Sequence, residues 1–122
     1  MAEILVCDDD KDIVEAIEIY LTQEGYHILK AYDGEQAIQV LQNNKVDLLI
    51  IDVMMPKLDG IGVLKRMQTL TFDKKPKIIV YSVSSIAIKM AASVSPLIDY
   101  CLLKPQSNER VYEVIQDLTS VP

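Results

Sequence analysis

The sequence has no tryptophan, only two cysteines and no long apolar run, and these absences narrow the class of protein. A membrane-spanning helix needs about 20 consecutive apolar residues, and no stretch of the chain approaches that length. The N-terminal residues Met1-Ala2-Glu3 lack the basic region of a signal peptide. Cys7 and Cys101 have no metal-ligand spacing and lie in apolar runs that predict buried strands. Together these features predict a cytoplasmic protein with free thiols and no membrane contact.

Positive charge is also scarce, since 12 Lys and Arg residues face 18 Asp and Glu residues and the net charge is −6. Direct nucleic-acid binding is therefore not expected, because contacts to phosphates need a basic face. The remaining composition, half apolar and a quarter charged, is typical of a globular domain. A length of 122 residues favours one domain with a single core, so residues 1–122 are expected to form one domain without a second.

Short apolar runs alternate with segments of helical periodicity along the whole chain. Runs without polar alternation, such as Leu48 to Ile51, are typical of strands buried on both faces of a parallel sheet. The predicted strands are 4–7, 26–32, 48–51, 77–82 and 100–103; the predicted helices are 11–23, 34 to about 44, 60–70, 84–94 and 108–118. This fivefold strand–helix alternation predicts an α/β domain whose parallel sheet is covered on both faces.

Polar residues stand directly after four of the five predicted strands. Asp8 and Asp9 follow the first strand, Asp52 the third, and Lys104 the fifth, while Ser82 ends the fourth. Ligands of open α/β sheets bind at the carboxyl ends of the strands, so these side chains are expected to share one site. Neighbouring carboxylates repel by about 4 kcal/mol per pair at an effective dielectric near 20. A divalent cation with hard oxygen ligands would remove that repulsion, and Mg²⁺ suits such a set.

The non-acidic members of this set are suited to binding a phosphoryl group. Ser82 can donate a hydrogen bond to a phosphate oxygen, and the Lys104 ammonium supplies a compact positive charge. Asp52 would then be a nucleophile that takes the phosphoryl group as an acyl phosphate.

In these motifs the chain resembles the receiver domain of bacterial two-component response regulators. The matching residues are Asp8-Asp9, Asp52 in the segment that runs through Pro56 to Asp59-Gly60, Ser82 and Lys104-Pro105. The spacing matches as well, because Ser82 lies 30 residues after Asp52 and Lys104 lies 22 after Ser82. The resemblance covers the whole chain.

The resemblance implies a flavodoxin-like (βα)5 three-layer sandwich with strand order 2-1-3-4-5. It further implies that Asp9, Asp52 and the backbone carbonyl of Met54 bind Mg²⁺ directly, while Asp8 holds a coordinated water. The phosphoryl donor would be a histidine kinase or phosphotransfer protein, or a small donor such as acetyl phosphate. Such a domain is a switch and not an enzyme, since it catalyses only its own phosphorylation and dephosphorylation. The family also often has a cis bond before the proline that follows its lysine, here Lys104-Pro105.

The chain departs from the family at the positions that transmit the signal. Receivers usually carry Tyr or Phe three residues before the lysine, where this chain has Cys101. Tyr100 is adjacent, but successive strand side chains point to opposite faces, so it cannot simply replace the missing aromatic. The small residue expected after Ser82 is Val83, whose methyl groups predict slower phosphoryl transfer to Asp52 than in a relative with Ala there.

Two other functions fit parts of the pattern. The domain could be a pseudo-receiver, a constitutive interaction module with the same fold, and Cys101 favours this alternative. It could also be a Mg²⁺-dependent aspartyl phosphatase, but such enzymes need a second acid two residues after the nucleophile, where Met54 stands. The apolar segment 84–94 predicts either contact with an effector or a second copy, through the face of the fourth helix, fifth strand and fifth helix, or deeper burial in the domain.

Overall fold

The computed structural model describes residues 2–119 and shows five strands alternating with five helices. The strands are β1 (Glu3–Cys7), β2 (His27–Ala31), β3 (Leu48–Ile51), β4 (Lys77–Ser82) and β5 (Tyr100–Leu103). The helices are α1 (Lys11–Gln23), α2 (Gly34–Asn43), α3 (Gly60–Met67), α4 (Ser85–Val94) and α5 (Asn108–Thr119). No helix within residues 2–119 has both the length and the apolar character needed to span a membrane.

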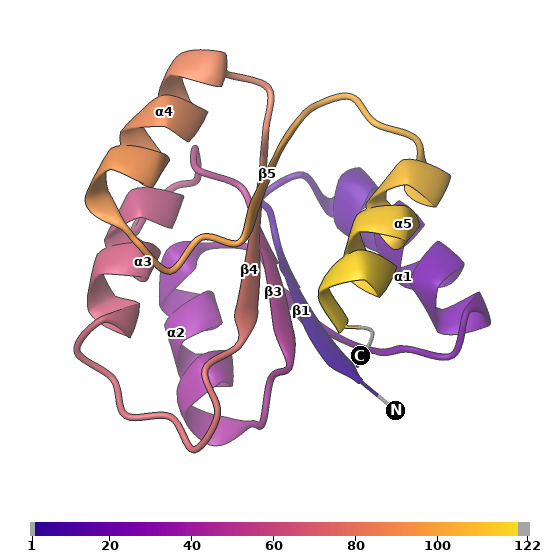
Figure 1. The fold of residues 1–122 in the computed structure, drawn as a ribbon, viewed down its shortest axis with the longest axis horizontal. Helices are drawn as coiled ribbons and strands as arrows, with labels where there is room; N and C mark the ends of the chain where they lie inside the picture. Colours follow the sequence, from indigo (N-terminus) through magenta and orange to yellow (C-terminus); the bar gives the residue numbers. More distant parts are fainter. Residues whose placement is uncertain (1, 120–122) are drawn as a thin grey trace.

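All five strands are parallel and lie in the order β2-β1-β3-β4-β5, as predicted. Figure 1 shows α2, α3 and α4 on one face of the sheet and α1 and α5 on the other. Side chains of β1, β3 and β4 alternate between two buried clusters, one under each helical layer. This arrangement is the flavodoxin-like three-layer sandwich, and it puts all strand carboxyl ends at one edge.

Local chemistry sets the beginnings of the helices. The side chain of Asp10 accepts hydrogen bonds from the backbone at the start of α1, and Asp33, Asp59 and Ser84 do the same for α2, α3 and α4. The Ser107 hydroxyl accepts from Arg110 N–H at the start of α5. Such caps satisfy N–H groups that have no partner within the helix.

The sequence-based boundaries were wrong by one to three residues at several ends. β2 is shorter at both ends than the predicted 26–32, and α3 stops at Met67 instead of about Leu70. Ser84 is the cap of α4 and not its first residue. Element ends depend on caps and tertiary contacts more than on periodicity, so errors of this size are expected.

The prediction that Cys101 is buried was wrong. Cys7 on the inner strand β1 is buried, but Cys101 is exposed, as are Tyr100 and Leu103 of the same strand, whereas Leu102 is buried. β5 is an edge strand that pairs only with β4, so fewer neighbours cover its side chains. An apolar run on an edge strand therefore does not imply burial.

The alternative in which α4 simply lies deeper in the domain is also wrong. Ala87 and Ala91 face the core, but the side chains of Ile86 and Met90 are 70% and 54% exposed. The two residues are one helical turn apart and form an apolar ridge on the outside of α4.

Candidate functional site

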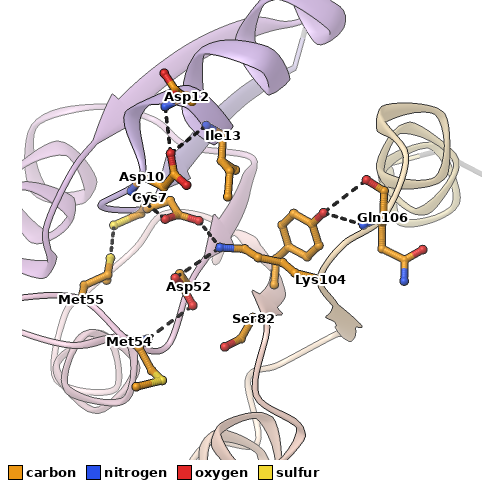
Figure 2. Close-up of polar contacts among 12 residues, drawn as sticks. Cys7, Asp10, Asp12, Ile13, Asp52, Met54, Met55, Ser82, Lys104 and Gln106 are labelled. Atoms are coloured by element: carbon orange, nitrogen blue, oxygen red, sulfur yellow. Dashed lines mark hydrogen bonds and ion pairs between the residues drawn. The ribbon is translucent and has the colours of Figure 1, made fainter.

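The strand-end residues converge on one edge of the sheet, at the carboxyl ends of β1, β3 and β5. One carboxylate oxygen from each of Asp8, Asp9 and Asp52 lies within 4.8 Å of the others. Lys104 reaches into this group, and its Nζ forms ion pairs with Asp8 Oδ2 and, at 3.3 Å, with Asp52 Oδ2. Figure 2 shows the Lys104 side chain extended toward Asp52 from the right in this view.

Backbone geometry explains why these particular side chains meet. Asp8 N–H donates to Ala31 O and Asp52 N–H donates to Cys7 O, so the sheet hydrogen bonding continues one residue past β1 and β3. Lys104 N–H donates to Ser82 O at 2.7 Å, which likewise continues the hydrogen bonding between β4 and β5 by one residue. The site residues are thus held by the sheet itself and not by flexible loops.

Gly60 keeps the loop after β3 close to the site. A Cβ at this position would collide with the backbone oxygen of Asp52 and with Val53. Its N–H donates to Val53 O at 2.8 Å, which closes the loop that carries Asp52 and Met54. Only a residue without a side chain permits this approach, so the Asp59-Gly60 pair of the sequence motif has a direct steric role.

The charged groups at the centre are largely shielded from water. The side chains of Asp8, Asp52 and Lys104 are 4%, 10% and 7% exposed, while Asp9 is exposed. Burial raises the pKa of Asp8, although the hydrogen bond from Lys104 opposes this effect. Burial by itself would lower the pKa of Lys104, but the hydrogen bonds and charges of Asp8 and Asp52 outweigh it and raise that pKa. The ammonium therefore stays protonated and neutralises one of two buried negative charges.

Ser82 and Met54 lie beside this charged group. Ser82 is completely buried, and its hydroxyl accepts a long hydrogen bond, 3.4 Å, from Ser84 N–H. The Met54 N–H donates to Asp52 Oδ1 at 3.4 Å, and the Met54 side chain projects outward with 61% exposure. Figure 2 shows Asp52 between Met54 and Lys104, with Ser82 below it in this view.

An open groove reaches Asp9 at the border of the site. It has a volume of about 710 Å³ and lies between the loop after β3 and the helices α3 and α4, with Asp9, Met54, Ile86 and Met90 among its lining residues. The apolar ridge of α4 forms one wall of this groove. The groove thus gives a phosphate-sized group access to Asp9, the exposed acid of the site.

Val83 and Pro105 lie on the opposite rim, where they line a smaller cavity with Lys104 and residues of α1. The Val83 side chain is 67% exposed, so crowding of Asp52 by Val83 stays a prediction. The Lys104-Pro105 bond is cis, as the resemblance predicted.

Two contacts around the site were not anticipated from the sequence. The Cys7 thiol lies under the site within 3.4 Å of the Met55 sulfur, and burial raises the pKa of Cys7, so it stays a thiol. The Tyr81 hydroxyl binds the backbone of Gln106, just after Pro105. The signal for the second contact was a tyrosine directly after the aliphatic residues Ile78 to Val80 and directly before Ser82.

Comparison with known proteins gives consistent matches. A family model described as "Response regulator receiver domain" matches residues 4–116. Response regulator MprA of a Mycobacterium species is 34% identical over 108 residues, which are 88% of this chain and 46% of that protein. Response regulator GtcR of Aneurinibacillus migulanus is 48% identical over 64 residues, or 52% of this chain and 26% of the relative. The chain thus spans less than half of the length of these relatives.

Solved structures with similar backbones cover nearly the whole chain. The receiver domain of a Francisella response regulator is 30% identical, with a TM-score of 0.82 over 97% of this chain and 96% of that one. The response regulator TrrA of Thermotoga maritima, solved in complex with Mg²⁺ and BeF, is 28% identical, with a TM-score of 0.82 over 97% and 99% of the two chains.

Proposed function

Because the chain belongs to the response regulator receiver domain family, we propose that it is a phosphorylation-dependent switch in which Asp52 accepts a phosphoryl group from a histidine kinase or phosphotransfer protein, with Mg²⁺ as cofactor. The observation that carries the proposal is the grouping of Asp8, Asp9, Asp52 and Lys104 at one edge of the sheet. We place this switch in the cytoplasm, where the two free thiols are stable.

The donor set fits magnesium. Three carboxylates and a backbone carbonyl offer only hard oxygen ligands, which Mg²⁺ prefers over softer donors. Asp9 and Asp52 would bind the ion directly together with the Met54 carbonyl, and Asp8 would bind a coordinated water. When bound, the ion neutralises the carboxylates and the phosphate oxygens that approach them.

The chain's own residues account for the transfer step. A carboxylate oxygen of Asp52 forms the new bond to phosphorus, and the bond from phosphorus to the donor's histidine nitrogen breaks, with its electron pair leaving on that nitrogen. Lys104 already lies 3.3 Å from Asp52, so a small movement pairs its ammonium with a phosphoryl oxygen. The Ser82 hydroxyl accepts from Ser84 N–H and keeps its own O–H free to donate to another phosphoryl oxygen.

Phosphorylation then changes the charge that holds the site together. The phosphoryl group replaces one negative charge on Asp52 by about two and adds acceptor oxygens. Lys104 directly follows β5 and Ser82 ends β4, so their movement shifts the loops that follow these strands. The expected output is a change at the α4–β5–α5 face, driven by local electrostatics.

Two alternatives remain for comparison. A pseudo-receiver is favoured by Cys101, since no aromatic side chain stands at the position that usually turns with the phosphorylated state. A phosphatase is disfavoured by Met54, whose thioether cannot act as the second acid.

Titration with Mg²⁺ and beryllofluoride, a phosphoryl mimic, tests the switch against the pseudo-receiver. We expect amide resonances to shift around Asp52 and also on α4 and β5, because the loops after β4 and β5 move. Shifts confined to residues around Asp52 would support the pseudo-receiver, and no shift at all would contradict a phosphate site. The amide spectrum of the Asp52→Asn protein under the same titration is the control.

We further propose that a second copy of the chain binds the α4–β5–α5 face. β5 is an edge strand with exposed Tyr100 and Leu103 side chains, and Arg110 of α5 donates to the Tyr100 hydroxyl. Exposed Asp99 precedes this strand, so both signs of charge occur on one face. Such a face can pair with itself about a twofold axis.

Sedimentation velocity tests this dimer. The protein should sediment as a monomer alone and as a dimer with Mg²⁺ and beryllofluoride. Leu103→Asp should abolish the dimer because it places a charge on the exposed apolar part of β5, whereas Ile19→Asp, which changes an exposed apolar residue on α1, should not. A monomer under all conditions would remove the proposal.

A further inference from the structure

The hydroxyl of Tyr81 joins the end of β4 to the loop that follows β5. Gln106 N–H donates to Tyr81 Oη at 3.0 Å, and the same hydroxyl lies 3.4 Å from Gln106 O, to which it donates. Figure 2 draws both contacts at Gln106. The tyrosine side chain is 6% exposed, so water competes little for this hydroxyl. The link spans 25 residues of sequence and is the third connection between these two segments, after the strand ladder and the Lys104–Ser82 backbone bond.

The same side chain also contacts the lysine of the site. Lys104 Nζ lies 5.4 Å from the centroid of the Tyr81 ring, a distance at which a cation is attracted to an aromatic face. The ring therefore borders the ammonium on one side while Asp8 and Asp52 hold it on the other. Because Tyr81 precedes Ser82, one short segment of β4 contacts both the lysine and its loop and also carries the buried hydroxyl.

From this geometry we propose that Tyr81 is a positioning residue: its ring and hydroxyl hold Lys104 and the Lys104–Gln106 loop in the place from which the ammonium meets a phosphoryl group on Asp52. The inference rests on the proposed function and adds a residue to it. Tyr81 also connects the site to the molecular surface near α1, in addition to the α4–β5–α5 face. A displacement of β4 at Ser82 reaches Gln106 through the Tyr81 hydroxyl, and Gln106 lies on the rim of the cavity between α1 and the loop. This route does not pass through Cys101.

The effect of losing the hydroxyl follows from what else holds the loop. Without it, the ladder between β4 and β5 persists up to Leu103, but Gln106 N–H loses its partner. Lys104 then still pairs with Asp8 and Asp52, but the loop that follows it is held less tightly. Misplacement of a reacting group by up to about 1 Å lowers the reaction rate by up to about 100-fold. Because Lys104 stays paired with its carboxylates, we expect the rate of phosphoryl transfer to fall by only about 3- to 10-fold.

Tyr81→Phe tests the proposal because it removes only the hydroxyl. We expect slower labelling of Asp52 by acetyl phosphate, and we expect the Gln106 amide to lose its response to Mg²⁺ and beryllofluoride while the Ser82 and Val83 amides keep theirs. Tyr112→Phe is the matched control, since it removes a hydroxyl on α5 that accepts from Gln116. It should change neither quantity.

The outcomes separate this inference from the proposed function. Normal labelling and a normal Gln106 response in Tyr81→Phe overturn the role of Tyr81 and leave the switch intact. Absence of labelling and of any beryllofluoride response in the unmodified protein refutes the switch itself. If Tyr81→Phe does not fold, amide exchange of the unmodified protein decides instead. The Gln106 amide should exchange slowly and shift with beryllofluoride, and a rapidly exchanging, unresponsive amide overturns the proposal.

Discussion

Asp52→Asn should reduce labelling by radioactive acetyl phosphate at least about 100-fold, because an amide oxygen cannot serve as the nucleophile that a carboxylate provides. Of the three acids that meet at the site, only Asp52 follows the central strand and also contacts both Lys104 and the Met54 N–H. The measurement is the initial rate of protein labelling in the presence of Mg²⁺, with the fold of the variant checked by its amide spectrum.

Asp73→Asn is the matched control for this prediction. Asp73 is exposed in the loop between α3 and β4, away from the strand ends that form the site. The substitution makes the same change in charge and should leave the labelling rate unaltered. Equal labelling of Asp52→Asn and the unmodified protein would show that another residue accepts the phosphoryl group, and the assignment of the site would fail.

Lys104→Met should destabilise the Mg²⁺-free protein by about 3 kcal/mol, because removal of one partner of a buried ion pair leaves the other charges uncompensated. In this chain the uncompensated groups are Asp8 and Asp52, whose side chains are only 4% and 10% exposed and which then repel each other. The methionine side chain fills much of the space of the lysine stem, so the loss reflects charge more than packing. Urea unfolding followed by circular dichroism measures the change.

Magnesium provides an internal check on the cause of this loss. If carboxylate repulsion is responsible, Mg²⁺ should stabilise Lys104→Met more than it stabilises the unmodified protein, since the ion replaces the missing positive charge. Lys30→Met is the control: Lys30 forms an exposed pair with Glu18, and loss of such a pair changes stability by about 1 kcal/mol or less. A Lys104→Met protein as stable as the original, with no extra effect of Mg²⁺, would contradict the electrostatic account of the site.

Most of the architecture could be predicted from local patterns. Four-residue apolar runs such as Leu48–Ile51 indicated strands, because a strand covered on both faces has no polar positions. Asp33, Asp59 and Ser107 cap their helices, and Asp and Ser directly before a helical segment favour that role because their side chains accept from its first N–H groups. Strand order, by contrast, came from the family resemblance, since alternation of strands and helices does not by itself decide which strands are neighbours.

The candidate site was predictable in its members but not in its contacts. Parallel strands place their carboxyl ends at one edge, so the polar residues after β1, β3 and β5 had to lie near one another. Which carboxylates the Lys104 ammonium pairs with depends on the twist of the sheet and on the path of its loop, and neither is encoded locally. The exposure of Cys101 was not predicted for a related reason. Whether a strand side chain is covered depends on segments far away in the sequence, and β5 has a neighbouring strand on one side only.

The order of residues alone thus determined that strands alternate with helices, that acids, a hydroxyl and a lysine follow the strands, and that the chain is acidic. These features depend on neighbours within a few positions, where periodicity and capping act. Tertiary structure decided that Cys101 on the edge strand β5 is exposed, which side of α4 stays uncovered, and that the Tyr81 hydroxyl meets Gln106 N–H. Burial and long-range hydrogen bonds depend on segments far apart in the chain, and only folding brings those together.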